Sequence, residues 1–170
     1  VESACELCEA TDATVCLRDG DSLVYNAHHG PIPVVLGRHV ISRGFAAGRA
    51  IVDRAPVHVH DVLSEEGDEF PGAKEWSVAQ GVRSLLSVPL MRDEESIGAI
   101  LLRRREVQPF TDKQITLLQT FADQAVIAIG NVRLFEEVQA KTRDLQESLQ
   151  FQTASAEVLK VISRSPDTLQ

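Results

Sequence analysis

The chain has 170 residues, and 25 acidic side chains against 17 Lys and Arg give it a formal net charge of −8 at pH 7. This balance argues against nucleic acid or an anionic membrane surface as a partner, because both require a basic footprint. Three cysteines, an odd number, favour reduced thiols in the cytoplasm over a disulfide framework. The longest apolar runs fall far short of the about 20 residues that span a bilayer, so we expect no membrane insertion.

Strand-type and helix-type segments alternate along the chain. In chain order, the pattern predicts the end of a helix, a strand hairpin, a short helix, a short strand, an irregular segment, a pair of strands and a long helix. These elements correspond to residues 1–9, 13–18 with 22–28, 42–53, 57–59, 61–81, 82–91 with 96–102, and 110–164. The order predicts an α+β domain with an antiparallel sheet and with helices packed mainly on one face.

A basic run, Arg103-Arg104-Arg105, ends the last predicted strand and is followed directly by acidic Glu106. A solvated strand end explains such a run better than a binding patch does. We therefore expect these arginines to lie in solvent.

The last predicted helix is about 80 Å long at 1.5 Å per residue, which is more than a domain of this size can bury. Its start is marked by Thr111 as N-cap, by Gln114 as the partner in a capping box, and by Phe110 and Ile115 as a hydrophobic staple. The first half carries a broad apolar face that can pack on a sheet. The second half is polar apart from one narrow apolar seam.

The narrow seam has the alternating three- and four-residue spacing of a coiled coil. It predicts a parallel homodimer, because parallel pairing sets identical polar residues opposite each other. A lone solvated helix is the alternative. We expect the polar positions Asn131, Thr142 and Gln152 to fix the register at some cost in stability. The predicted dimer seam consists of Phe135, Val138, Thr142, Leu145, Leu149 and Gln152.

Two short patterns have spacings that can hold a metal or support redox chemistry. Cys5 and Cys8 form a C-x-x-C motif, and Cys16 with a histidine would have to complete a zinc site. Buried structural cysteines are the simpler interpretation. His58 and His60 share one face of the short predicted strand, where they either bind a metal together or lie on an exposed face.

The residues that follow position 80 carry a resemblance to a known family. The segment from Gly81 to Gln139 resembles the C-terminal half of a GAF domain of the type found in bacterial sensor histidine kinases. The resemblance rests on Ser-Val-Pro-Leu at 87–90, Ile-Gly at 97–98, Pro-Phe-Thr at 109–111 and Phe-Ala-Asp-Gln-Ala at 121–125. The resemblance to this type of GAF domain extends over roughly residues 1–138. The segment 155–170 also resembles the helix that leads into another GAF domain, which implies a tandem array.

The resemblance implies a cytoplasmic, dimeric sensory module with a small-molecule pocket that feeds an output domain such as a histidine kinase. The implied organisation is a GAF-like domain at 1–132 with a truncated first helix, a coiled-coil connector at 133–165, and the start of a linker at 166–170. Its partners would be a second copy of itself, an unidentified small ligand, and neighbouring GAF and output domains of the parent chain.

The chain itself is expected to be non-catalytic, since no nucleophile elbow, phosphate loop or paired-carboxylate spacing is present. The phosphoacceptor histidine of a kinase would lie outside it. Two other functions stay open. One is a redox or metal sensor that uses Cys5, Cys8 and Cys16. The other is a ligand-free dimerisation scaffold in a nucleotide cyclase or another output protein.

The cofactor is left unknown. GAF relatives that bind bilins attach them through a pocket cysteine, and no cysteine follows Cys16, so covalent bilin is not expected. The Asn-Lys pattern of cyclic-nucleotide-binding relatives is missing as well. Haem on a lone histidine, for example His28, His29 or His39, stays open.

A ligand pocket is expected between the sheet and the segment 42–81, since concave apolar surface with a few polar groups is typical of small-ligand sites. Aromatic and hydroxyl side chains would line it, and a carboxylate and a guanidinium would anchor the ligand. The candidate ligand-binding residues are Phe45, Asp61, Phe70, Trp76, Arg83 and Ser87.

Overall fold

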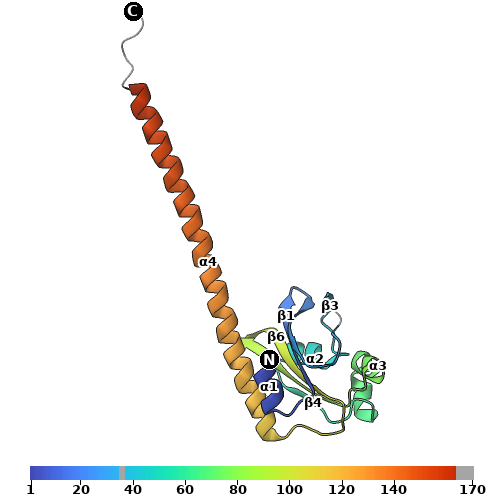
Figure 1. Ribbon diagram of the computed structural model, residues 1–170. Helices are drawn as coiled ribbons and strands as arrows, with labels where there is room; N and C mark the ends of the chain where they lie inside the picture. The colour runs from blue at the N-terminus through green and yellow to red at the C-terminus, as the bar shows by residue number, and fades with distance from the viewer. Residues whose placement is uncertain (35–36, 164–170) are drawn as a thin grey trace, which may run out of the picture. The chain divides into compact units, whose positions relative to one another are not determined.

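The structure, a computed structural model, describes residues 1–34 and 37–163 and divides into two units, Val1–Ile127 and Ala128–Gln170. The first unit is built on a six-stranded sheet in the order β3-β2-β1-β6-β5-β4, in which all neighbours are antiparallel (Figure 1). The strands are β1 Asp12–Asp19, β2 Ser22–His29, β3 Arg38–Val40, β4 Val57–Val59, β5 Ser84–Arg92 and β6 Glu95–Arg104. The helices are α1 Glu2–Leu7, α2 Ala46–Asp53, the 3₁₀ turn η1 Glu65–Glu69, α3 Pro71–Gln80 and α4 Asp112–Ser163.

The α+β class and the antiparallel sheet are confirmed. The placement of the helices differs in one detail, because they cover both faces of the sheet instead of mainly one. Strand β5 is buried over Ser84–Leu90, so its side chains are covered on both sides. Helices α2 and α3 lie on one face, and α1 with the start of α4 lies on the other (Figure 1).

The central pairing of β1 with β6 requires a glycine. Gly98 lies opposite Leu17, and a Cβ at this position would collide with the backbone oxygen of Cys16. The glycine at position 98 is therefore explained by the close approach of two backbones.

Helix α3 and strand β3 are the elements that the sequence analysis missed. The segment 61–81 was expected to be irregular, yet it forms η1 and the ten-residue helix α3. Pro71 occupies the first turn of α3, and Gly81 ends it in the left-handed conformation at φ 68°. These are recognised helix boundaries, but the apolar periodicity between them is weak, since Val78 is exposed.

The expectation that Arg103 and Arg104 lie in solvent is wrong, because each is only 2% exposed. As neighbours on β6 their side chains point to opposite faces of the sheet. Arg104 donates to the carbonyl oxygens of Cys8 at 2.7 Å and Gln108 at 2.7 Å, and its guanidinium lies 4.0 Å from the ring centroid of Phe110. It thereby ties the end of α1 to the segment that enters α4.

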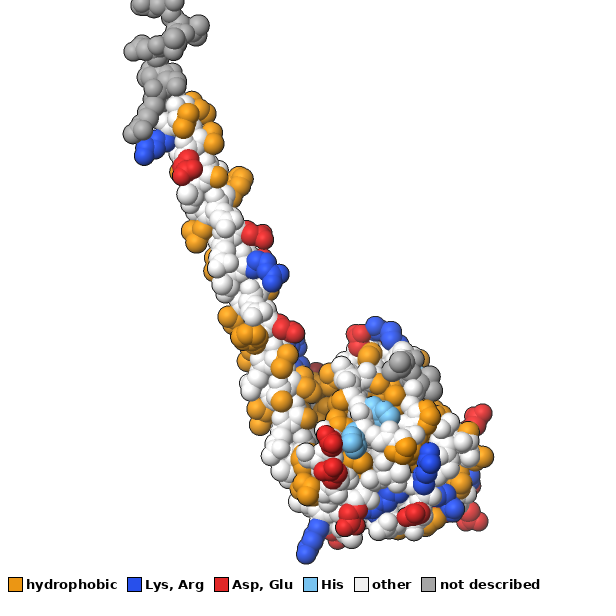
Figure 2. Space-filling view, in the orientation of Figure 1, with side chains coloured by type: hydrophobic (Ala, Val, Ile, Leu, Met, Phe, Trp, Pro, Cys, Tyr) orange, Lys and Arg blue, Asp and Glu red, His pale blue; other side chains and the backbone are white. Residues whose placement is uncertain are grey.

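Helix α4 begins with the predicted capping box. The N–H of Gln114 donates to Oγ1 of Thr111 at 3.3 Å, and the N–H of Thr111 donates to Oε1 of Gln114 at 3.0 Å. The helix continues to Ser163, and residues 164–170 of the predicted connector and linker lie outside the described residues. In the described part of unit Ala128–Gln170, the predicted seam residues Phe135, Val138, Leu145 and Leu149 are exposed apolar side chains. Figure 2 shows hydrophobic side chains on the surface along this part of α4.

By length and composition alone, one helix among the described residues, α4, could cross a membrane. The core helix of a soluble protein meets the same criterion. Leu118 and Ala122 of α4 are buried within unit Val1–Ile127. The neighbouring Asp123 would cost a membrane span about 3 kcal/mol. The absence of membrane insertion therefore stays a prediction.

Candidate functional site

A cavity of about 160 Å³ lies in the first unit between the sheet and helices α2 and α3. Strands β2, β5 and β6 form its floor, and residues at the start of α2 and in the middle of α3 form its other walls. Most of its lining is aliphatic or aromatic. Such a concave apolar site with a few polar groups is the usual form of a small-ligand pocket.

The one Lys or Arg among the described lining residues is Arg103, and it is neutralised by Asp12. The Nε and Nη2 groups of Arg103 both donate to Oδ1 of Asp12, with an Nε–Oδ1 distance of 2.7 Å. Asp12 is fully buried, and its Oδ2 accepts from the N–H of Ile32 at 2.9 Å and lies 2.8 Å from Nε2 of His28. The additional contacts of Asp12 offset part of the cost of burying its charge.

Several aromatic rings line the cavity, and one of them lies near the Arg103 guanidinium. The guanidinium lies 5.2 Å from the ring centroid of Trp76 on α3. The rings of Tyr25 and His39 meet edge to face with centroids 5.5 Å apart. Burial raises the pKa of the Tyr25 hydroxyl, which therefore stays neutral at physiological pH.

Ser77 on α3 supplies a polar group that the fold leaves unused. It is fully buried, and its Oγ has no hydrogen-bond partner among the described residues. Buried polar atoms are nearly always paired, so an unpaired one in a cavity wall points to a group that is supplied from outside the chain.

Two of the six candidate ligand residues line this cavity. Trp76 forms part of the α3 wall, and the ring of Phe45 lies at the start of α2. Phe70 is buried beneath the guanidinium of Arg49, whose carbon lies 4.1 Å from its ring centroid. Ser87 is buried on β5, with an Oγ that has no partner among the described residues, and it is absent from the lining.

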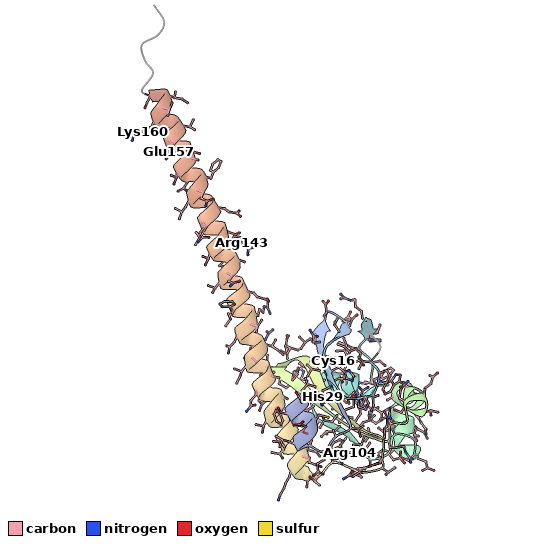
Figure 3. All side chains as sticks on the ribbon, viewed as in Figure 1. Cys16, His29, Arg104, Arg143, Glu157 and Lys160 are labelled. Atoms are coloured by element: carbon pink, nitrogen blue, oxygen red, sulfur yellow. The ribbon has the colours of Figure 1, made fainter. Side chains whose placement is uncertain are left out.

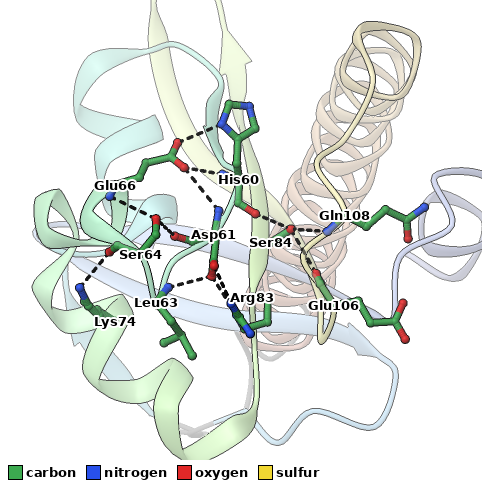
Figure 4. A network of polar contacts seen from close by, with 10 residues as sticks. All are labelled: His60, Asp61, Leu63, Ser64, Glu66, Lys74, Arg83, Ser84, Glu106 and Gln108. Atoms are coloured by element: carbon green, nitrogen blue, oxygen red, sulfur yellow. Dashed lines mark hydrogen bonds and ion pairs between the residues drawn. The ribbon is translucent and has the colours of Figure 1, made fainter.

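Asp61 and Arg83, the expected polar anchors, bind each other (Figure 4). Nη2 of Arg83 donates to Oδ2 of Asp61 at 2.6 Å, and Nε donates to Oδ1 at 2.8 Å. This hydrogen bonding lowers the pKa of the Asp61 carboxyl. Oδ1 of Asp61 also accepts from the N–H of Leu63 at 3.1 Å, so the pair fastens the loop before η1 to the start of β5.

Three polar residues of the cavity, Tyr25, Ser77 and Arg103, were missed by the sequence analysis. Ser77 was missed because α3 was taken for a loop, and Arg103 because its run was interpreted as solvated. Pro71 and Gly81 were the available signals for the helix. No local signal pairs Arg103 with Asp12, which lies 91 residues away.

The three cysteines are free and buried. Figure 3 shows Cys16 on the sheet, where burial raises the pKa of its thiol to about 11. Burial also raises the pKa of the Cys5 and Cys8 thiols. Protonated thiols are poor nucleophiles and poor metal ligands.

The two strand histidines form no metal group either. Rings of His58 and His60 lie 4.5 Å apart between centroids, and Nε2 of His58 accepts from the N–H of Phe110. Within the described ranges, no group of three His, Cys, Asp or Glu side chains could hold a metal ion.

A larger hollow of about 390 Å³ lies elsewhere in the same unit. It is open and lined by side chains of both charges, including Arg18, Asp21, Arg54 and Glu95. Ser77 and Arg103 line the smaller cavity, and for this reason we regard the smaller cavity as the candidate site.

Comparison with solved structures gives the same fold. The chain is similar to the GAF-B domain of DevS from Mycobacterium smegmatis, with 23% identity, a TM-score of 0.63, and coverage of 81% of this chain and 92% of that one. It is similar to a domain assigned to a two-component sensor histidine kinase of Sinorhizobium meliloti 1021, at 20% identity and a TM-score of 0.63, covering 81% and 91%. It is also similar to the GAF domain of a phosphoenolpyruvate-protein phosphotransferase from Coxiella burnetii, at 19% identity and a TM-score of 0.65, covering 79% and 80%.

Sequence comparison extends to a curated protein. Over 72 residues the chain is 36% identical to the DNA-binding transcriptional activator HyfR of Escherichia coli (strain K12), which is 42% of this chain and 10% of that protein. The chain thus spans about a tenth of that relative's length. Residues 1–129 match the model of the GAF domain family, and this is more than half of the chain. On this match and its fold, the chain belongs to the GAF domain family.

Proposed function

We propose that this GAF domain binds a small molecule in the cavity between the sheet and helices α2 and α3, and that it relays the bound state through α4 to an output domain. GAF domains are regulatory, non-catalytic signalling domains. The observation that carries the proposal is an apolar cavity of about 160 Å³ whose lining includes Ser77, a residue whose hydroxyl has no partner among the described residues. The parent protein we propose is a bacterial sensor histidine kinase, in line with the Sinorhizobium domain.

The proposed relay is a parallel homodimer of the seam residues on α4. Exposed Phe135, Val138, Leu145 and Leu149 recur with the coiled-coil spacing, and these side chains gain about 25 cal/mol for each Å² of apolar surface that a partner helix covers. A ligand that favours one of two packings of such a seam by a few kcal/mol would switch the output.

A redox or metal sensor that uses Cys5, Cys8 and Cys16 is a weaker proposal. Burial raises the pKa of all three thiols, whereas sensor cysteines are exposed and have a low pKa. A ligand-free scaffold would leave the Ser77 hydroxyl unexplained.

A ligand screen with a matched pair of variants tests the binding proposal. The melting temperature of the chain is measured against a broad library of small molecules, because a compound that binds only the folded state raises it by mass action. Ala73→Leu fills part of the cavity and should abolish the shift by a hit compound. Ala79→Leu adds the same side chain to the exposed face of α3 and should preserve the shift. If no compound shifts the wild type, or if both variants respond alike, the cavity is not a ligand site.

A further inference from the structure

We infer that the cavity selects an uncharged ligand of about the size of one aromatic ring, with a mainly apolar surface and a single hydroxyl or carbonyl group that pairs with Ser77. This inference rests on the proposed function, since it assumes that the cavity binds a ligand. Charge, size and the unpaired hydroxyl each lead to it separately.

The charge of the site is balanced before any ligand arrives. Arg103 is the one Lys or Arg among the described lining residues, and no Asp or Glu is found among them. Two donors of Arg103 already bind Oδ1 of Asp12, which is fully buried. An anionic ligand would lose its hydration without gaining an uncompensated positive charge. A cationic ligand would find both oxygens of Asp12 engaged, since Oδ2 binds the N–H of Ile32 and lies against His28.

The volume of the cavity accommodates a group of about the size of one ring. Its volume of about 160 Å³ is close to that of an engineered apolar cavity of about 150 Å³ that binds benzene. Its walls include the rings of Phe45, Trp76 and Tyr25 and the side chains of Leu85 and Leu101. Such walls suit a flat apolar body, because aromatic side chains stack on rings or meet them edge to face.

The single polar group follows from Ser77. Its hydroxyl can donate one hydrogen bond and accept others, and it makes none with the described residues. A hydroxyl or carbonyl on the ligand would satisfy it. Two other polar lining side chains already have partners: Arg103 binds Asp12, and Oγ of Ser42 accepts from the N–H of Gly44 at 3.1 Å.

Four probes that share one ring and differ in one substituent test the inference on the whole chain by calorimetry. They are benzyl alcohol, benzamide, benzoate and benzylamine, of which benzylamine is protonated at neutral pH. We expect the two neutral probes to bind at least tenfold more tightly than the two charged ones. Equal or tighter binding of benzoate or benzylamine overturns the inference, even where the library screen has shown that the cavity binds ligands.

A pair of serine variants tests the polar contact. Ser77→Ala should weaken benzyl alcohol about threefold to tenfold, as expected for one neutral hydrogen bond. It should leave the chain folded, because it removes an unpaired hydroxyl. Ser87→Ala removes another buried hydroxyl without a described partner that is absent from the lining, and it should not change affinity. Unchanged affinity in Ser77→Ala, or an equal loss in both variants, overturns the role of Ser77.

If none of the four probes binds while charged compounds of the library do, the inference fails and the proposed function stands.

Discussion

The backbone N–H of Phe110 donates a hydrogen bond to Nε2 of His58 at 2.9 Å, which links strand β4 to the residue that precedes the N-cap of α4. Because Nε2 accepts this bond, His58 must be neutral, with its proton on Nδ1. The two rings also meet edge to face, with centroids 5.9 Å apart. The entry to the long helix is therefore held by a neutral imidazole, and protonation of Nε2 would remove this hydrogen bond.

The first prediction is that this link makes stability depend on pH. Burial lowers the pKa of His58 below its ordinary 6.5; His60 and Arg104 lower it further, and Glu66 and Asp112 act in the opposite direction. The unfolded chain therefore binds more protons than the folded one in the window below pH 6.5. The contribution of His58 is present above pH 6.5 and is lost as the pH falls from 6.5 through the folded pKa.

Urea unfolding at pH 7.5 and at pH 5 measures this dependence. His58→Gln keeps an acceptor that does not titrate and should reduce the loss of stability at pH 5. His29→Gln, at the end of β2, serves as the matched control and should leave the loss unchanged. Equal pH slopes for wild type and His58→Gln would show that another group is responsible.

The second prediction concerns the buried ion pair of Arg103 and Asp12. Arg103→Leu leaves Asp12 buried without its cationic partner and should reduce the free energy of unfolding by about 3–5 kcal/mol. Arg38→Leu breaks the exposed pair with Asp19 and should cost at most about 1 kcal/mol. Urea unfolding at pH 7 compares the free energy of unfolding of the two variants. A similar loss of stability in both would mean that Asp12 binds another partner or accepts a proton.

The third prediction is a dimer held by the α4 seam. At about 100 μM, a concentration that populates a weak dimer by mass action, light scattering should give twice the mass of one chain. Leu145→Asp with Leu149→Asp places like charges opposite each other in the seam and should give a folded monomer. Ser148→Asp with Gln150→Asp adds the same charge outside the predicted seam and should remain a dimer. A monomeric wild type, or a dimeric seam variant, rules out this seam.

The fourth prediction distinguishes buried thiols from a redox sensor. Burial raises the pKa of all three thiols, that of Cys16 to about 11, so little thiolate is present at pH 8. A thiol reagent should modify the native chain at least a hundredfold more slowly than the urea-unfolded chain, in which three thiols should react. Rapid modification of Cys5 or Cys8 in the native chain would support the redox alternative.

Local patterns that act over a few residues were sufficient for much of the fold. The hairpin around Gly20, the pair β5–β6 and the capping box of Thr111 and Gln114 each depend on neighbours along the chain or on strand periodicity. Helix α3 was missed because its contacts are made by Ala73, Ser77 and Trp76 with distant parts of the unit, and its exposed face includes Val78. Its apolar pattern was too weak to identify the helix.

The candidate site was predicted less well than the fold. Phe45 and Trp76 were placed in the pocket because large aromatic residues in a segment over a sheet tend to line its concave side. Asp61 and Arg83 were chosen as ligand anchors because they are charged, whereas in the structure each is the other's partner. Charged residues alone cannot indicate a site until their partners are known.

The sequence by itself determined the α+β class, the antiparallel pairing, the start of α4 and the spacing of its seam, because these depend on periodicity and on capping within a few residues. The tertiary structure alone decided that Arg103 is buried against Asp12, that Arg104 joins α1 to the entry of α4, and that the Ser77 hydroxyl is left unpaired in a cavity. Each of these depends on residues brought together from distant parts of the chain. Whether a buried polar group is satisfied is a property of that packing, and no local pattern encodes it.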